Sequence, residues 1–140
     1  MNRGSIARLL LAALAALMFS GLYYGLVVGA VWRELSGVEG SSSWWEPLAQ
    51  LARNLVVASV LALTFKKTAI NRTRPALGLS IMLWVGFQAM AIAGSVIHEH
   101  YPLALYAIHV VDQLGTMIIM AFCLTFGRRE GRPITSQLEH

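Results

Sequence analysis

The stretch LLLAALAALMFSGLYYGLVVGAVW, residues 9–32, runs for 24 residues without a charged side chain. A helix of this length rises about 36 Å, which exceeds the ~30 Å hydrocarbon core of a bilayer. A cleaved signal peptide is the rival interpretation, because Arg3 and Arg8 precede the run. The apolar part of a signal peptide, however, ends after about 7 to 15 residues. The stretch therefore predicts a first transmembrane helix over residues 6–32.

Three further apolar runs predict helices over residues 47–65, 76–97 and 103–127. Of all residues, 56% are hydrophobic and 13% are charged, whereas about 25% charged residues are usual in a soluble domain. A core built from 140 residues could not bury so much apolar surface, so lipid is the expected solvent. We predict an all-α fold: an integral membrane four-helix bundle, with residues 1–140 as a single transmembrane domain. The final residues 138–140 resemble the remnant of a purification tag and carry no weight.

The basic residues alternate between the flanks of the four runs. Two precede the first run, one follows it, four separate the second from the third, none lies in the next connection and three lie in the tail. Because Lys and Arg accumulate in cytoplasmic flanks, both termini are predicted to be cytoplasmic, in the inner (plasma) membrane of a bacterium. The same placement accounts for the net charge of +4 without a nucleic-acid partner, which would require a basic face on a folded domain.

Polar side chains interrupt all four apolar runs at a similar depth. Counted from the outer ends of the helices, they lie about 9 to 15 Å into the membrane. Each of these side chains must have a structural or functional role, because inserting an ionisable side chain at a helix centre into the membrane costs about 2.5 to 3.5 kcal/mol. We predict that they line a pocket in the outer half of the membrane, formed by Tyr24, Arg53, Asn54, Gln88, His109, Asp112 and Gln113.

An ion pair between Arg53 and Asp112 is expected in this layer, because arginine keeps its proton and an unpaired buried carboxylate would take one. Three roles stay open: ties between helices, a pocket for a small molecule or ion, and a proton relay through His109 and Asp112. His109 is the only deep histidine, which argues against a bis-histidine haem. No catalytic triad order, CxxC, zinc-helix motif or phosphate loop is recognisable, so we expect no metal, no cofactor and no enzymatic activity.

Small residues suggest how the helices pack. Gly21, Gly25 and Gly29 recur at every fourth position, which would place them on one helical face that another helix can approach closely. Packing within the bundle and a face for a homo-oligomer or a partner membrane protein both remain open. In addition, Pro47-Leu48-Ala49 and Pro102-Leu103-Ala104 open the second and fourth runs alike, which hints at a parallel repeat of two hairpins.

Three short motifs carry a family resemblance. They are Tyr23-Tyr24-Gly25 in the first run, Leu83-Trp84-Val85-Gly86-Phe87 in the third, and the polar corner with Glu99 and Pro102. In these the chain resembles a family of small bacterial membrane proteins, domain of unknown function seventeen-sixty-one. The resemblance implies four helices and no known activity. That family commonly has asparagine and an aromatic residue where His109 and Asp112 stand, so a role for these two residues would not be shared by the family.

Two functions fit these observations. The leading hypothesis is a non-enzymatic, multi-pass membrane protein, surrounded by the lipid bilayer, that binds or conducts a small solute through the polar pocket of its outer half. The alternative is an accessory or scaffolding membrane subunit that packs against a partner through the glycine face.

Overall fold

The computed structural model describes residues 3–37 and 43–126, and the regular elements within these ranges are all helical. Two of the four long helices contain a short π-helical segment, labelled η. In chain order the elements are α1 (Arg3–Leu22), η1 (Tyr23–Val27), α2 (Gly29–Ser36), α3 (Glu46–Lys67), α4 (Thr73–Leu83), η2 (Trp84–Ala89), α5 (Met90–His98) and α6 (Leu103–Thr125).

Four helical spans are long and apolar enough to cross a membrane: Gly4–Val27, Glu46–Lys67, Thr73–His98 and Leu103–Thr125. The bounds lie within a few residues of the predicted ones, except that the first helix continues through α2 to Ser36. Gly127, the predicted end of the last helix, and residues 138–140 lie outside the described ranges.

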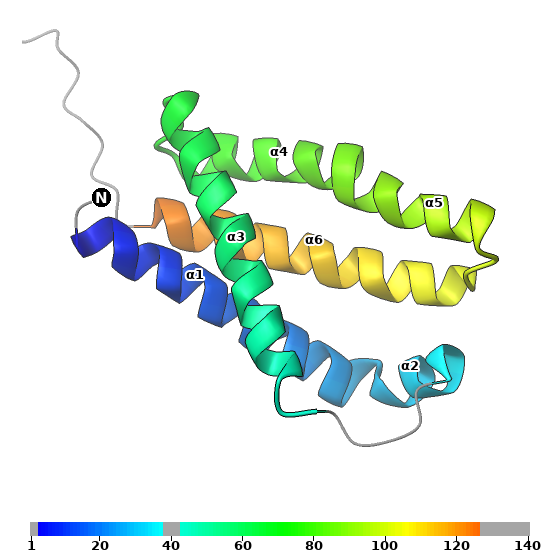
Figure 1. The fold of residues 1–140 in the computed structure, drawn as a ribbon. Coiled ribbons are helices and arrows are strands. Elements are labelled where there is room, and N and C mark those ends of the chain that lie inside the picture. Colours follow the sequence, from blue (N-terminus) through cyan, green and yellow to red (C-terminus); the bar gives the residue numbers. More distant parts are fainter. Residues whose placement is uncertain (1–2, 38–42, 127–140) are drawn as a thin grey trace, which may run out of the picture.

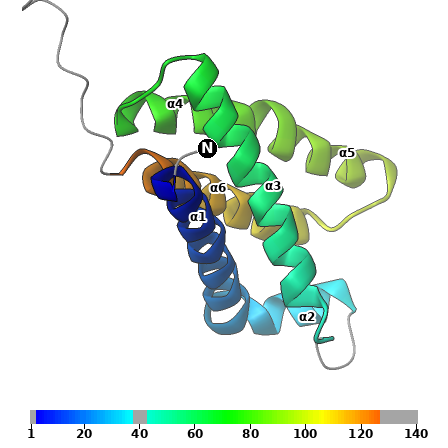
Figure 2. The ribbon, with the colours of Figure 1, turned by 60° about the vertical axis from the view of Figure 1, so that its left-hand side comes forward.

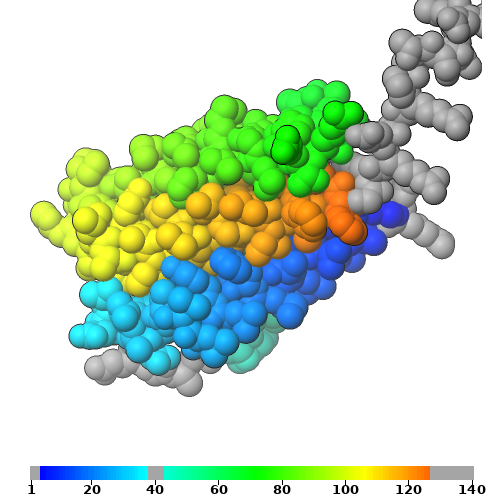
Figure 3. Space-filling view, turned by 180° about the vertical axis from the view of Figure 1, so that it is seen from behind, coloured from blue at the N-terminus to red at the C-terminus, as the bar shows by residue number. Residues whose placement is uncertain are grey.

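The helices form a layer of three that the remaining helix crosses. The α1–η1–α2 rod, α6 and the α4–η2–α5 rod lie side by side with α6 in the centre, and α3 runs obliquely over one face (Figure 1, Figure 2). Seen from behind, the same three rods cover the opposite face (Figure 3). α3 packs chiefly on α1 and only lightly on α6. The predicted helices are therefore present, in a more open arrangement than a four-helix bundle.

Small side chains allow the close approach of α1 to its neighbours. Ala12 and Ala16 on α1 and Ala58 on α3 are completely buried, together with Leu61 and Phe65 farther along α3. In a membrane, where apolar side chains gain little by leaving lipid, such close backbone packing is a main source of helix association.

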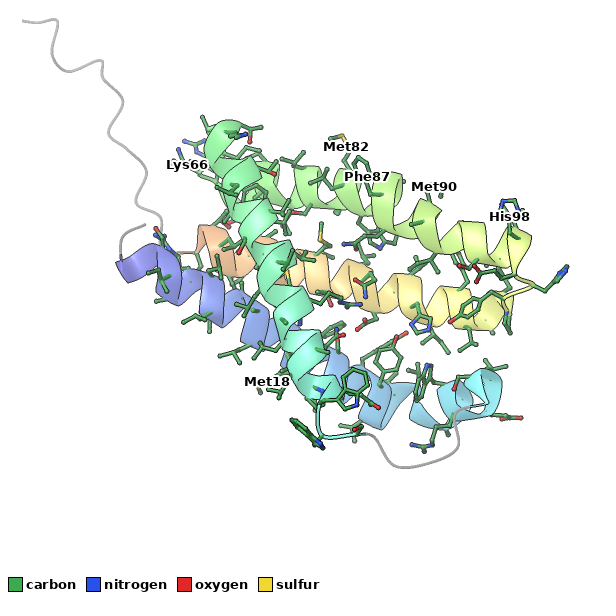
Figure 4. All side chains as sticks on the ribbon, in the orientation of Figure 1. Met18, Lys66, Met82, Phe87, Met90 and His98 are labelled. Carbon is green, nitrogen blue, oxygen red and sulfur yellow. The ribbon has the colours of Figure 1, made fainter. Side chains whose placement is uncertain are left out.

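Large apolar side chains cover the outside of the molecule. Leu26 is 80% exposed and Phe87 is 71% exposed. Met82, Phe87 and Met90 point away from the layer along the outer side of α4, η2 and α5 (Figure 4). An apolar surface of this extent would promote aggregation in water and is the expected surface of a chain surrounded by acyl chains.

The glycine face predicted for the first helix is interrupted. A Cβ at Gly21 or Gly25 would meet nothing within 4 Å, whereas a Cβ at Gly29 would collide with the backbone oxygen of Tyr24. The cause is η1, in which the amide of Val28 donates to the oxygen of Tyr23 at 3.0 Å, five residues back. This wider turn breaks the period of an α-helix, so Gly29 leaves the face that Gly21 and Gly25 share.

Burial in the first and third spans follows one pattern. Ala16 and Ser20 are buried on α1, and Ala76 and Ser80 are buried at the corresponding positions of α4, 60 residues later. A π-helical segment follows in both spans, and both α1 and α4 pack against α6. The first and third spans thus share a burial pattern, while the parallel repeat suggested by the openings of the second and fourth runs stays a prediction.

Gly115 provides a test of the packing between α1 and α6, because a Cβ at this position would collide with the ring of Phe19. We expect Gly115→Ala to destabilise the protein by about 1 to 3 kcal/mol, the usual result of overpacking, and to lower its apparent melting temperature in detergent by about 3 to 10 °C. Gly78→Ala is the matched control, since nothing lies within 4 Å of its added Cβ. Equal melting temperatures for the two variants would contradict this packing.

Candidate functional site

A pocket of about 600 Å³ lies between α3, the second half of the third span and α6. Its lining residues come from α3, η2, α5, the corner after α5 and the first half of α6. In Figure 1, α5 and the first half of α6 extend beyond α3. Its volume is within the range of pockets that bind small molecules. Seven of its lining residues have polar side chains: Arg53, Gln88, Ser95, Glu99, Tyr101, His109 and Gln113.

Four of the seven residues predicted for the pocket line it, namely Arg53, Gln88, His109 and Gln113. The other three do not. Tyr24 and Asp112 stand behind the lining and hold His109 and Gln113, respectively, by hydrogen bonds. Asn54 turns to α1 instead, where its Nδ2 donates to the backbone oxygen of Ala13 at 3.4 Å. Because Asn54 is 1% exposed, it acts as a tie between α3 and α1.

His109 is held between two tyrosines. The hydroxyl of Tyr24 and Nδ1 of His109 share a hydrogen bond of 2.7 Å, in which the tautomer of the imidazole determines the donor. The ring of Tyr101 stacks on the imidazole with a centroid distance of 6.0 Å, and Trp32 packs edge-on against Tyr24 at 5.7 Å. These contacts fix the orientation of His109 in the wall of the pocket.

Asp112 is 2% exposed and takes both of its side-chain hydrogen bonds from neutral groups. The hydroxyl of Ser20 donates to Oδ1 at 2.7 Å, and the amide of Gln113 donates to Oδ2 at 3.2 Å. Nothing in the sequence singled out Ser20, although it lies one helical turn before Tyr24 and so shares its face.

The predicted ion pair between Arg53 and Asp112 is wrong. Within residues 3–37 and 43–126 no ion pair joins them; Arg53 is exposed and lines the pocket, while Asp112 faces Ser20 of α1. The reason lies in the packing: α6 contacts α1 along much of its length but meets the crossing α3 only lightly.

The segment η2 contributes Gln88 to the pocket lining. The indole nitrogen of Trp84 donates to the backbone oxygen of Val110 at 3.0 Å and so fastens η2 to α6. In the same segment, Oε1 of Gln88 is buried and has no hydrogen-bond partner among the described residues. A buried carbonyl oxygen without a donor is a costly arrangement that a bound molecule could relieve.

Three polar lining residues were missed by the sequence analysis: Ser95, Glu99 and Tyr101. Ser95 follows Gln88 by two helical turns and Glu99 follows by one more, so counting along the face of Gln88 would have found them. Tyr101 lies in the corner outside the membrane spans, where burial raises the pKa of its hydroxyl. Its phenol accordingly stays protonated at neutral pH. Within the described ranges, no three His, Cys, Asp or Glu side chains come together as a metal site would require.

Comparison with protein families gives one match. The model of the family described as "Protein of unknown function (DUF1761)" matches residues 8–125. The chain belongs to the DUF1761 family. This confirms the resemblance that the three sequence motifs suggested. No curated protein and no solved structure matches the chain. All seven polar residues of the pocket fall within the DUF1761 region.

Removal of the hydroxyl that holds Asp112 should destabilise this DUF1761 protein. In Ser20→Ala a buried carboxylate oxygen loses its donor, and we expect a loss of about 0.6 to 2 kcal/mol, measured as a lower apparent melting temperature in detergent. Ser59→Ala is the control, because the hydroxyl of Ser59 bonds to Leu55 of its own helix at 2.7 Å. If both serines are equally dispensable, the bond between α1 and α6 does not stabilise the fold.

Proposed function

We propose that this membrane protein binds or conducts a small polar solute through the pocket between α3, α5 and α6. The carrying observation is the pocket itself, about 600 Å³ in volume and lined by seven polar side chains in a chain whose other exposed side chains are largely apolar. Polar groups placed in a membrane span are expensive and therefore point to a function when they are not consumed by the fold.

The intramembrane polar residues divide into two groups, and the division supports solute binding over simple helix ties. Ser20 and Asp112 are buried and join α1 to α6, and Nδ2 of Asn54 joins α3 to α1. Oδ1 of Asn54 is buried without a partner among the described residues, but Asn54 does not line the pocket. By contrast, Arg53 has no ion-pair partner and Oε1 of Gln88 has no hydrogen-bond partner in the described part of the chain. Groups of the second kind are available to a ligand.

A proton relay through His109 and Asp112 has less support. His109 bonds to Tyr24 and Asp112 bonds to Ser20 and Gln113, and no hydrogen bond connects the two residues in the described structure. We therefore propose a role without catalysis, metal or cofactor.

We further propose that both termini are cytoplasmic, in a bacterial plasma membrane, and that the pocket lies in the outer half. The start of α1, the basic connection between α3 and α4, and the end of α6 lie at one end of the molecule (Figure 1). α2 and the corner between α5 and α6 lie at the other end. Basic flanks gathered at one end favour that end as the cytoplasmic one.

Cysteine labelling tests this orientation. In a Cys123→Ser background, a maleimide that does not cross membranes should label His98→Cys in intact cells, and should label Thr68→Cys only after permeabilisation. Both positions are exposed, so accessibility depends on the side of the membrane. Labelling of Thr68→Cys alone in intact cells would reverse the proposed orientation.

Solute binding is tested by thermal stabilisation of the purified protein in detergent with four classes of solute: sugars, organic anions, amines and amino acids or peptides. At ten times its dissociation constant, a true ligand should stabilise the protein by about 1.4 kcal/mol. Ser95→Trp should fill the pocket and abolish the response. Met90→Trp on the same helix is the control, since Met90 points outward and the response should persist (Figure 4). Absence of a response to all four classes and to a zwitterionic lipid would exclude the proposed function.

A scaffolding role is the second candidate, favoured by the open space at Gly21 and Gly25 on the outer face of the first span. Two such positions allow another membrane helix to approach closely. In the same preparations, this role is supported if no solute stabilises the protein while a complex of defined stoichiometry forms and is lost in Gly25→Leu.

A further inference from the structure

Two charged side chains line the pocket and come from different elements. Arg53 projects from α3, and Glu99 occupies the C-cap position of α5. In the described part of the chain the two do not form an ion pair with each other, and neither has another ion-pair partner there. The lining thus carries one positive and one negative charge, held apart.

We infer that the pocket recognises a zwitterion, whose anionic group pairs with Arg53 and whose ammonium group pairs with Glu99. This inference rests on the proposed solute binding and names the class of solute. A guanidinium is suited to an anionic group because its N–H donors form a planar fork that matches a carboxylate or a phosphate.

The other lining groups suit the cationic end of such a solute. Oε1 of Gln88 is a buried acceptor without a donor, and an ammonium group provides three N–H donors. The aromatic ring of Tyr101, beside Glu99 in the corner, offers a surface that attracts a cation. Gln88 lies in η2 and Glu99 follows the end of α5 11 residues later, so a single ammonium group reaches one of these two acceptors and the other remains for a further N–H donor of the solute.

Charge balance disfavours the simpler classes of ligand. An anion without a cationic group would leave Glu99 uncompensated, and an amine without an anionic group would do the same to Arg53. A neutral solute would leave both charges without a partner in a site from which it displaces water. Both side chains are exposed in the free protein, and covering either charge without pairing it opposes binding, so the lining favours a molecule that carries both groups.

Two sources supply this chemistry: a free zwitterion, such as an amino acid or a short peptide, and the phosphoethanolamine headgroup of a lipid. The test measures the apparent melting temperature of the full chain in detergent against alanyl-alanine and against dioleoyl phosphatidylethanolamine. Each has matched partners that lack one charge. For the peptide these are its N-acetylated and C-amidated forms, and for the lipid it is phosphatidylglycerol.

We expect at least one of the two zwitterions to stabilise the protein, with an apparent affinity at least tenfold higher than that of its single-charge partners. A response to the peptide alone indicates a solute from water, and a response to the lipid alone indicates a headgroup. Either result supports the inference.

The variants should change the selectivity in a characteristic way. In Arg53→Gln, the affinity for the zwitterionic peptide should fall at least tenfold. This variant should then bind the zwitterionic peptide and its C-amidated form, which keeps the ammonium group, with equal affinity. In Glu99→Gln, the zwitterionic peptide and its N-acetylated form, which keeps the carboxylate, should bind with equal affinity. Arg53→Lys should retain the preference for the zwitterion. Arg33→Gln and Glu34→Gln, in exposed positions on α2 away from the pocket, are the matched controls and should behave as wild type.

The possible failures are distinguishable. Stabilisation by sugars, by anions alone or by amines alone would contradict the zwitterion inference but leave the proposed solute binding intact. Equal binding of the zwitterion and its blocked forms would have the same meaning. Absence of stabilisation by any class overturns both.

Discussion

The buried contact of α6 with α1 constrains the rest of the molecule. Asp112 must find donors inside the protein because lipid offers none, and it finds them in Ser20 of α1 and in its own neighbour Gln113. With one face of α6 joined to α1, α4 and η2 pack along another, fastened there by Trp84. α3 is then left to cross the layer, and the part of the layer that it leaves uncovered becomes a wall of the pocket.

This arrangement separates the polar groups that hold the fold from those available to a ligand. The first group is buried between pairs of helices, where Ser20 and Asn54 reach across to a neighbour. The second is spread along η2, α5, the corner and the first half of α6, with Arg53 on α3 opposite them. Tyr24 connects the two groups, since it belongs to the first span and yet fixes His109 in the lining.

Much of the fold could be predicted because it follows from composition and length. Four apolar runs give four helices whatever their neighbours are, and the prolines at 47 and 102 lie close to two observed helix starts. Which helix faces which was harder to predict. The sequence shows that Arg53 and Asp112 lie at similar depths, but depth says nothing about the rotation of a helix or about its crossing of another. The pairing of Asp112 with Ser20 depends on that rotation, and so does the turning of Asn54 to α1.

The candidate site was predicted in part for the same reason. Gln88, His109 and Gln113 are conspicuous because a polar residue in an apolar run needs an explanation, whereas Ser95 is small enough to pass unnoticed. Glu99 was taken as part of a polar corner, which it is, but that corner also holds Tyr101 and closes one end of the pocket.

The π-helical segment η1 sets the direction of the aromatic side chains beyond it. In a regular α-helix, residues eight positions apart point about 80° away from each other. A π turn holds one additional residue and so reduces the rotation between the two positions by about 100°. Trp32 therefore comes to lie over Tyr24, and their ring centroids are 5.7 Å apart. Loss of a single residue from Tyr23–Val27 would leave a good helix and yet turn the indole away from the phenol. At this place the number of residues is a stricter requirement than their identity.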